Sequence, residues 1–275
     1  MPQNIILNSL KQSLISIWKN KSLFVLLFIL QVVFFIIFSV INLTYQAKIL
    51  TNIQAITSYL SQQKLDEASA TANLLQQKSL LGDDPLLISR NFNEMVKNFR
   101  LYLIYAFILL VIFISMAWVI THRLSYKFNS KQFAKNFFNI FLVLLFYLGL
   151  IFLFFFSLLN ISVVQLATPS QLLIKYVPFF IFSVILAYFM FVSLSLSHYT
   201  ELKNIVQKTL SIGIRKMRYI LAAYFINIFL FIMPIILLYY FIEKNLFILI
   251  LSLMLMIFSF VFGRIFMVSV VEKLE

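Results

Sequence analysis

The sequence predicts an all-α integral membrane protein with six transmembrane helices, an outer helical hairpin and basic amphipathic helices at the membrane surface. Of its 275 residues, 63% are hydrophobic and only 11% are charged. A soluble domain carries about 25% charged residues, and its surface could not leave so much Phe, Leu and Ile exposed. A transmembrane β-barrel is disfavoured, because barrels alternate apolar and polar residues whereas this chain has long apolar runs and four glycines.

Six apolar runs are long enough to cross the ~30 Å hydrocarbon layer, which takes about 20 helical residues. They lie at residues 23–43, 101–121, 137–160, 176–197, 219–242 and 246–271. Arg264 lies about 27 Å along the last helix from Leu246, so we expect it to reach the inner headgroups. The first run follows three lysines, is too long for a cleaved signal peptide and lacks a small-x-small cleavage site, which predicts an uncleaved signal anchor.

Lysine and arginine gather on one side of these spans and predict the orientation. The segments on that side are residues 1–22, 122–136, 198–218 and the tail 272–275. The two short loops on the other side, 161–175 and 243–245, hold one lysine each, and the longer segment 44–100 is nearly balanced in charge. The sequence therefore places both termini and the basic segments in the cytoplasm of a plasma-membrane protein.

The basic segments 1–22, 122–136 and 198–218 precede the first, third and fifth spans, and each predicts an amphipathic helix on the membrane surface. Its cations are expected to contact anionic lipid or an acidic protein partner, and nucleic acid is not expected because the cations lie beside the membrane. These cations are Lys11, Lys19, Lys21, Lys127, Lys131, Lys135, Lys208, Arg215, Lys216 and Arg218. The recurrence fits a threefold repeat of about 80 residues, or only the basic flanks common to multi-pass chains.

Residues 44–100 predict an antiparallel helical hairpin above the membrane. Apolar residues spaced 4, 3 and 4 apart form two coiled-coil-like seams, one at Ile49, Ile53, Ile56 and Leu60 and the other at Ile88, Phe92, Met95 and Phe99. Asp84 followed by Pro85 predicts a capped helix start between the seams. The hairpin stiffens the first two spans or offers a surface to a partner, and packing is the primary use of such a seam.

Few residues suggest chemistry. His122 and His198 end the second and fourth spans, and Glu201 shares a helix face with His198, a set too small for a typical metal site. A second group of polar residues lies within or at the ends of the spans: Ser193, Ser195, Ser197, His198 and Asn227. These residues could line a polar path through the membrane, although interhelical hydrogen bonding is the commoner role of such residues. The four glycines predict few close helix contacts through small residues. We find no nucleotide-binding or hydrolase motif and expect no cofactor or metal.

These features support three classes of function. The first is a non-enzymatic scaffold or accessory subunit that acts through helix contacts, the outer hairpin and anionic lipid. The second is the membrane subunit of an exporter, which the chain resembles in layout only, and layout does not determine function. The third is an intramembrane enzyme, which depends on His198 and Glu201 alone. A polar groove between spans would favour the transporter, and a closed apolar interior the scaffold.

Overall fold

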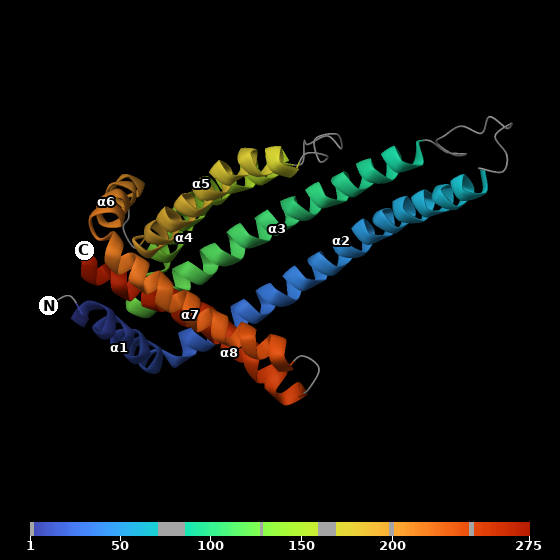
Figure 1. Ribbon diagram of the computed structural model, residues 1–275. Coiled ribbons are helices and arrows are strands. Elements are labelled where there is room, and N and C mark those ends of the chain that lie inside the picture. The colour runs from blue at the N-terminus through green and yellow to red at the C-terminus, as the bar shows by residue number, and fades with distance from the viewer. Residues whose placement is uncertain (1–2, 71–85, 127–128, 159–168, 198–200, 242–244) are drawn as a thin grey trace.

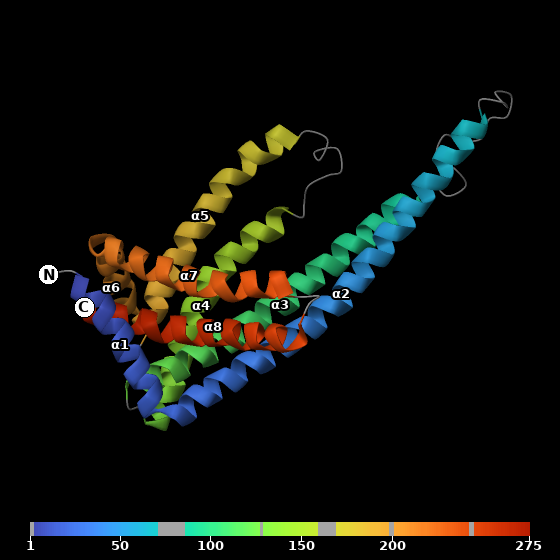
Figure 2. The ribbon, with the colours of Figure 1, turned by 60° about the horizontal axis from the view of Figure 1, so that its bottom comes forward.

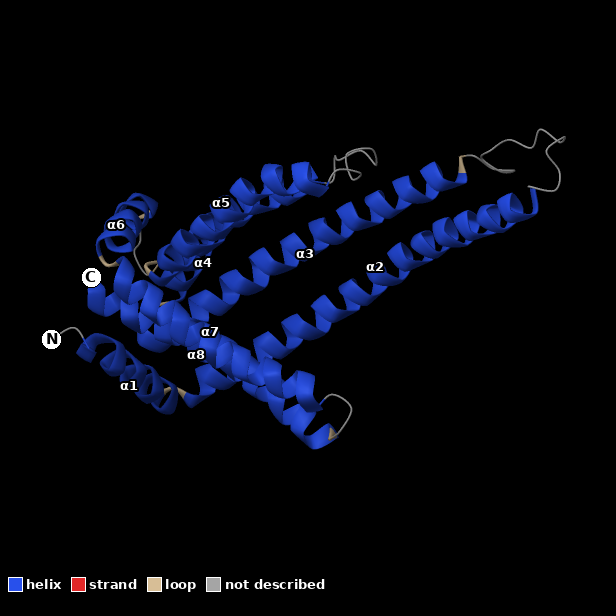
Figure 3. Cartoon of the chain, viewed as in Figure 1, coloured by secondary structure: helices blue, strands red, loops and turns tan. Residues whose placement is uncertain are grey.

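The computed structural model describes residues 3–70, 86–126, 129–158, 169–197, 201–241 and 245–275. Every element assigned within these residues is an α-helix, and none is a strand (Figure 3). Six of these helices are long and apolar enough to cross a membrane. The chain is therefore an all-α, multi-pass membrane protein, as its composition predicts.

The described residues form eight helices. They are α1 (Gln3–Lys19), α2 (Lys21–Ala70), α3 (Leu87–Ser125), α4 (Ser130–Leu158), α5 (Pro169–Ser195), α6 (Leu202–Arg215), α7 (Met217–Phe241) and α8 (Leu246–Leu274). Helices α2, α3, α4, α5, α7 and α8 contain the membrane spans. Helix α2 continues outward from its span as one helix of 50 residues. The predicted turn at Asp84 and Pro85 lies outside the described residues.

The six spanning helices form three antiparallel pairs, α2–α3, α4–α5 and α7–α8 (Figure 1). The first pair extends beyond the other two, and α7–α8 diverges from both as it runs outward (Figure 2). At the opposite end the three pairs come together, and α1, α6 and both chain termini lie there. We call this the basic end, because the basic segments of the sequence lie on it.

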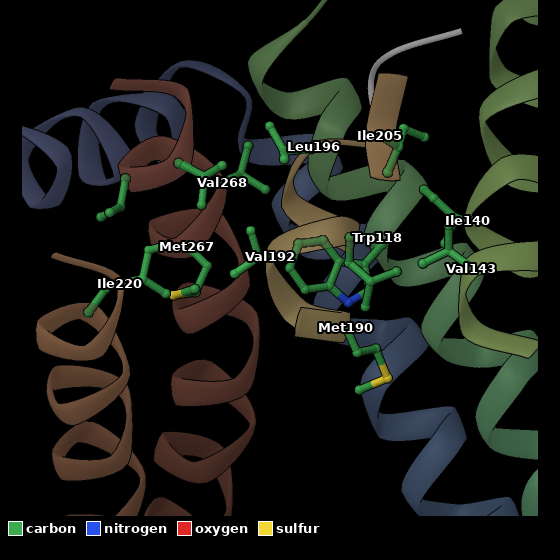
Figure 4. Packing of buried hydrophobic residues seen from close by; sticks show 14 of the residues in the cluster. Trp118, Ile140, Val143, Met190, Val192, Leu196, Ile205, Ile220, Met267 and Val268 are labelled. Carbon is green, nitrogen blue, oxygen red and sulfur yellow. The ribbon is translucent and has the colours of Figure 1, made fainter. Parts of the chain in front are cut away.

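The buried core lies at the basic end (Figure 4). Trp118 of α3 is 1% exposed and packs among Met190 and Val192 of α5 and Met267 of α8. Helices α4, α6 and α7 contribute further side chains to the same cluster. In a bilayer such packing stabilises the helix bundle through van der Waals contact. Lipid tails are as apolar as the side chains, so there is no hydrophobic driving force between the helices.

A second buried cluster attaches the first span. Leu27 of α2 is buried against Ala117 and Ile120 of α3 and against Val261 and Ile265 of α8. Helices α3 and α8 contribute to both clusters. These two helices therefore form the central pair around which the other helices pack.

Aromatic rings join α2 to α3 along their length. The ring of Phe34 lies 5.6 Å from that of Phe113. Further outward, the Tyr45 ring lies 6.2 Å from Tyr102 and 5.9 Å from Tyr105. Contacts of this kind add about 0.5–1.5 kcal/mol each beyond the area they bury, so they help to hold α2 and α3 together where this pair extends beyond the other helices.

The outer seams differ in part from the prediction. Ile49 and Ile56 of α2 are half-buried, whereas Ile53 and Leu60 are 39% and 42% exposed and Phe99 of α3 is 37% exposed. Residues seven apart lie on one face of a helix, and Ile53 and Leu60 lie to the side of the face that holds Ile49 and Ile56. Two helices that pack without others bury only a narrow stripe of side chains on each helix, so Ile53 and Leu60 stay outside the buried stripe of α2.

Helix α1 packs on α8 through small residues. The Ser9 hydroxyl donates to the Ser269 carbonyl oxygen at 3.2 Å, and the Ser269 hydroxyl donates to the Ser9 carbonyl oxygen at 3.3 Å. Ser13 is also buried. The low glycine content suggested few close contacts of this kind, and that expectation was wrong here because serine takes the place of glycine.

Gly263 determines how closely α7 approaches α8. A Cβ atom at this position would lie 3.1 Å from Oδ1 and 3.3 Å from Cγ of Asn227 on α7. Gly149 of α4 offers a contrast, because a Cβ atom there would meet no atom within 4 Å.

Replacing Gly263 with leucine should separate α7 from α8, whereas Gly149→Leu should be tolerated. Overpacking costs about 1–3 kcal/mol, which corresponds to a fall of roughly 2–10 °C in melting temperature for a chain of this size. Thermal unfolding of the purified variants in detergent measures the difference. Equal melting temperatures for G263L and G149L would show that the close approach at Gly263 is not a constraint.

Candidate functional site

The histidine at the end of the second span is buried and stabilises the end of α5. His122 is fully buried, and its Nε2 lies 2.7 Å from the carbonyl oxygen of Leu194 and 2.9 Å from Oγ of Ser197. The Ser197 hydroxyl also donates to the Leu194 carbonyl oxygen, at 2.6 Å. Since α5 ends at Ser195, its last carbonyl groups have no partner within the helix. His122 supplies one from α3.

The serines of the proposed polar path take part in local hydrogen bonds. Ser193 donates to the Tyr147 hydroxyl at 3.3 Å and lies 3.0 Å from Oγ1 of Thr209, so it joins α4, α5 and α6. Ser195 donates to the carbonyl oxygen of Phe191 in its own helix. Asn227 instead contacts α8, through a 3.3 Å hydrogen bond from Nδ2 to the Gly263 carbonyl oxygen. The serines and Asn227 thus contact different helices.

The pair proposed for chemistry, His198 and Glu201, is described only in part, because His198 lies outside the described residues. Glu201 is exposed and accepts a hydrogen bond of 3.1 Å from Nδ2 of Asn204. Within the described part of the chain, no three His, Cys, Asp or Glu side chains are grouped closely enough to hold a metal ion.

Most of the basic residues singled out in the sequence are exposed at the basic end. They are Lys11, Lys19, Lys21, Lys131, Lys135, Arg215, Lys216 and Arg218. Lys127 lies outside the described residues. The Lys21 ammonium lies 4.3 Å from the ring centroid of Trp18, and the Arg218 guanidinium 4.8 Å from that of Tyr219. Cations paired with amphipathic rings are typical of the membrane–water boundary.

Two acidic residues at the C-terminal end of α8, Glu272 and Glu275, interact with residues of α6 and at the end of α3. Lys208 of α6 forms an ion pair with Glu275, so this lysine is engaged within the protein. Burial, followed by the charge and hydrogen bond of Glu272, raises the pKa of the Tyr126 phenol above its ordinary value. The phenol therefore stays protonated and acts as the donor. These contacts fix α6 and the end of α3 to the C-terminus.

Helix α6 presents three faces. Ile205 and Ile212 are buried against the bundle. Val206, Leu210 and Ile214, spaced four residues apart, form an apolar stripe that is 55%, 50% and 66% exposed. Arg215, an exposed cation of α6, lies beyond this stripe on the helix surface, whereas Lys203 lies at the start of the stripe itself. A helix with one face on the protein, one apolar and one basic is suited to the boundary between protein, acyl chains and headgroups.

Helix α1 has a similar arrangement. Ile6 and Leu10 pack against the core, whereas Leu7, Leu14 and Trp18 are 64%, 55% and 74% exposed. The exposed three recur at helical spacing and lie beside the lysines of the same helix. Helices α1 and α6 both lie at the basic end (Figure 1), and each exposes apolar and basic side chains.

Sequence reasoning missed an arginine inside the bundle. Arg264 of α8 donates a hydrogen bond of 3.0 Å from Nη2 to Oε1 of Gln31 on α2. Gln31 is buried and lies ten residues after Lys21, which is about 15 Å along the helix axis. That distance corresponds to the middle of a ~30 Å hydrocarbon layer. The missed signal was that Gln31 and Arg264 are each ten residues from the inner end of their helix.

Two cavities flank Arg264. The first, of about 290 Å³, lies between α3, α5, α7 and α8, and Asn227 and Ser259 are among its lining residues. The second, of about 260 Å³, lies between α2, α3, α5 and α8 and includes Gln31 in its wall. Apolar side chains make up most of both walls. The interior at this depth is therefore neither fully closed nor free of charge.

The comparisons with known proteins add no relative. No protein-family model matches the chain, and no similar curated protein or solved structure was found. Function is therefore argued from the geometry described above.

Replacing His122 with alanine should destabilise the packing of α5 against α3. The change removes a buried hydrogen-bond partner of the Leu194 carbonyl group and leaves a cavity, which together cost about 2–4 kcal/mol. The exposed Lys131→Ala change should stay within about 0.5 kcal/mol of the parent protein. Denaturant unfolding in detergent followed by circular dichroism makes the comparison. If H122A were as stable as K131A, the bond to α5 would be dispensable.

Proposed function

We propose that this chain is a non-enzymatic membrane scaffold or accessory subunit that works through helix contacts and anionic lipid. The observation that carries the proposal is the border formed by α1 and α6 at the basic end. Both helices pack one face on the bundle and leave an apolar stripe exposed beside basic residues. This construction suits a protein that takes hold of a membrane surface rather than one that encloses a reaction.

The border is built for anionic lipid in particular. Eight of the cations singled out in the sequence are exposed on or beside α1, α4 and α6, and each Lys or Arg near an anionic leaflet contributes about 1 kcal/mol of attraction. The cytoplasmic leaflet of the plasma membrane carries this negative charge. The same asymmetry of charge supports the orientation in which the basic end and both termini face the cytoplasm. An acidic cytoplasmic partner would be attracted to the same surface.

The membrane subunit of an exporter is a second candidate, and the cavities beside Arg264 favour it. A scaffold needs only a closed interior, whereas a transporter needs space and polar groups between its spans. Asn227 and Arg264 line such a space near mid-membrane. Purification from native membranes separates the two candidates, because an ATPase that co-purifies would support the exporter and remove the scaffold.

Neutralising the basic border should reduce the preference for anionic lipid. We expect the triple change Arg215→Gln, Lys216→Gln and Arg218→Gln to lower the preference for phosphatidylglycerol over phosphatidylcholine by about tenfold or more. Spin-labelled lipids in reconstituted vesicles measure that preference directly.

A matched triple variant controls for net charge. Lys48→Gln, Arg90→Gln and Lys97→Gln remove three cations from the outer hairpin and should leave the preference unchanged. The assignment of the lipid-binding surface to the basic end would be refuted if this control lost the lipid preference and the variant changed at Arg215, Lys216 and Arg218 kept it.

A further inference from the structure

Arg264 carries a positive charge that the surrounding helices are not placed to neutralise. The next acidic residue along α8 is Glu272, eight positions on and about 12 Å along the axis. Helices α5 and α7 contain no acidic residue, and the first one in α2 is Asp66. A charge within a bilayer is costly unless it is paired, and for this reason such residues mark ligand sites or ion paths.

The guanidinium group of Arg264 retains unused hydrogen-bonding capacity. It has five N–H donors, and the bond to Gln31 uses one Nη atom. Its Nε atom is buried and has no hydrogen-bond partner among the described residues. Nε and an Nη atom together form the fork that binds a carboxylate or a phosphate through two parallel hydrogen bonds. The unmet need at Arg264 is therefore for an acidic group.

The space beside Arg264 is suited to hydrocarbon. Trp118, Phe191 and Phe260 line both cavities, so Arg264 stands where the two spaces meet. Binding pockets that accept apolar groups are typically lined in this way, with a few polar atoms that orient the ligand. A ligand that fits both features has an acidic head and an apolar chain.

Asn227 adds a requirement for a hydrogen-bond donor. Its Nδ2 donates to the Gly263 carbonyl oxygen, whereas its Oδ1 is buried and has no partner among the described residues. Asn227 lies against the residue that precedes Arg264 in α8. A hydroxyl or N–H group close to the acidic head of a ligand would satisfy this oxygen.

We propose that Arg264 and Asn227 form an intramembrane binding site for an anionic amphiphile. Its carboxylate or phosphate is bound by Arg264, its chain occupies the apolar cavities, and a donor near its head reaches Asn227. An anionic membrane phospholipid and a free lipid-like acid share this chemistry. The site lies about half a bilayer away from the basic border and does not depend on it.

Tryptophan fluorescence tests the site directly, because Trp118 is in the wall of both cavities. The other tryptophan is Trp18, which is 74% exposed on α1, so Trp18→Phe leaves Trp118 as the single reporter. The W18F protein in phosphatidylcholine nanodiscs is titrated with dibromostearic acid, dibrominated phosphatidylglycerol or dibrominated phosphatidylcholine. Bromine quenches an indole that it contacts.

We expect saturable quenching by an acidic probe and none by brominated phosphatidylcholine. Saturation by the phospholipid identifies a membrane lipid as the ligand, and saturation by stearate alone identifies a free acid. Equal quenching by acidic and zwitterionic probes would overturn the proposal. This comparison uses no Arg264 variant, so it stands even if such a variant fails to fold.

A charge variant then assigns the binding to Arg264. On the W18F background, Arg264→Gln should raise the half-saturating concentration of the acidic probe by about tenfold or more, since it removes a charge-assisted hydrogen bond. Arg264→Lys should retain most of the binding, and Lys97→Gln, which removes an exposed charge from the outer part of α3, should retain all of it. Unchanged binding in R264Q would contradict the assignment.

Discussion

Hydrocarbon offers no hydrogen-bond partner, and this constraint governs every polar side chain inside the bundle. His122 and Ser197 are satisfied at the end of α5, Ser193 between α4 and α6, and Ser9 and Ser269 by each other. Polar residues thus serve mainly to fix helices against one another. Nε of Arg264 and Oδ1 of Asn227 differ from these groups, because neither atom has a hydrogen-bond partner among the described residues.

The same constraint divides the molecule into two parts. At the basic end, α3 and α8 lie within buried clusters to which all the other helices contribute. Outward from that end the helix pairs diverge (Figure 2), and many of their large apolar side chains are exposed. The basic border and the intramembrane arginine both lie in the packed part. A ligand bound beside Arg264 would contact the central helices, and α1 and α6 are packed against the same core.

The sequence alone was sufficient for the class of fold and the six spans, because composition and run length report directly on the solvent around the chain. The sequence was insufficient wherever the position of a side chain depended on which helix packs against its own. The spacing of Arg264 from Leu246 predicted contact with the headgroups, and it gave no sign of the hydrogen bond that Arg264 makes with Gln31 on α2. The seam residues Ile53 and Leu60 were misplaced for a similar reason, since periodicity names a face but not the width of the contact. The serine contact between α1 and α8 joins residues 260 positions apart, a distance at which local pattern carries no information.

The most direct test of the whole account is the side of the membrane on which each end of the bundle lies. The chain has no cysteine, so single cysteines introduced at Lys11, Lys97 and Arg215 are unique labelling sites. In intact cells, a membrane-impermeant maleimide should label the cysteine at position 97 and should reach positions 11 and 215 only after the membrane is opened. Labelling of positions 11 and 97 from the same side would contradict the account, because it would remove the odd number of spans between them and the orientation on which the lipid-binding border depends.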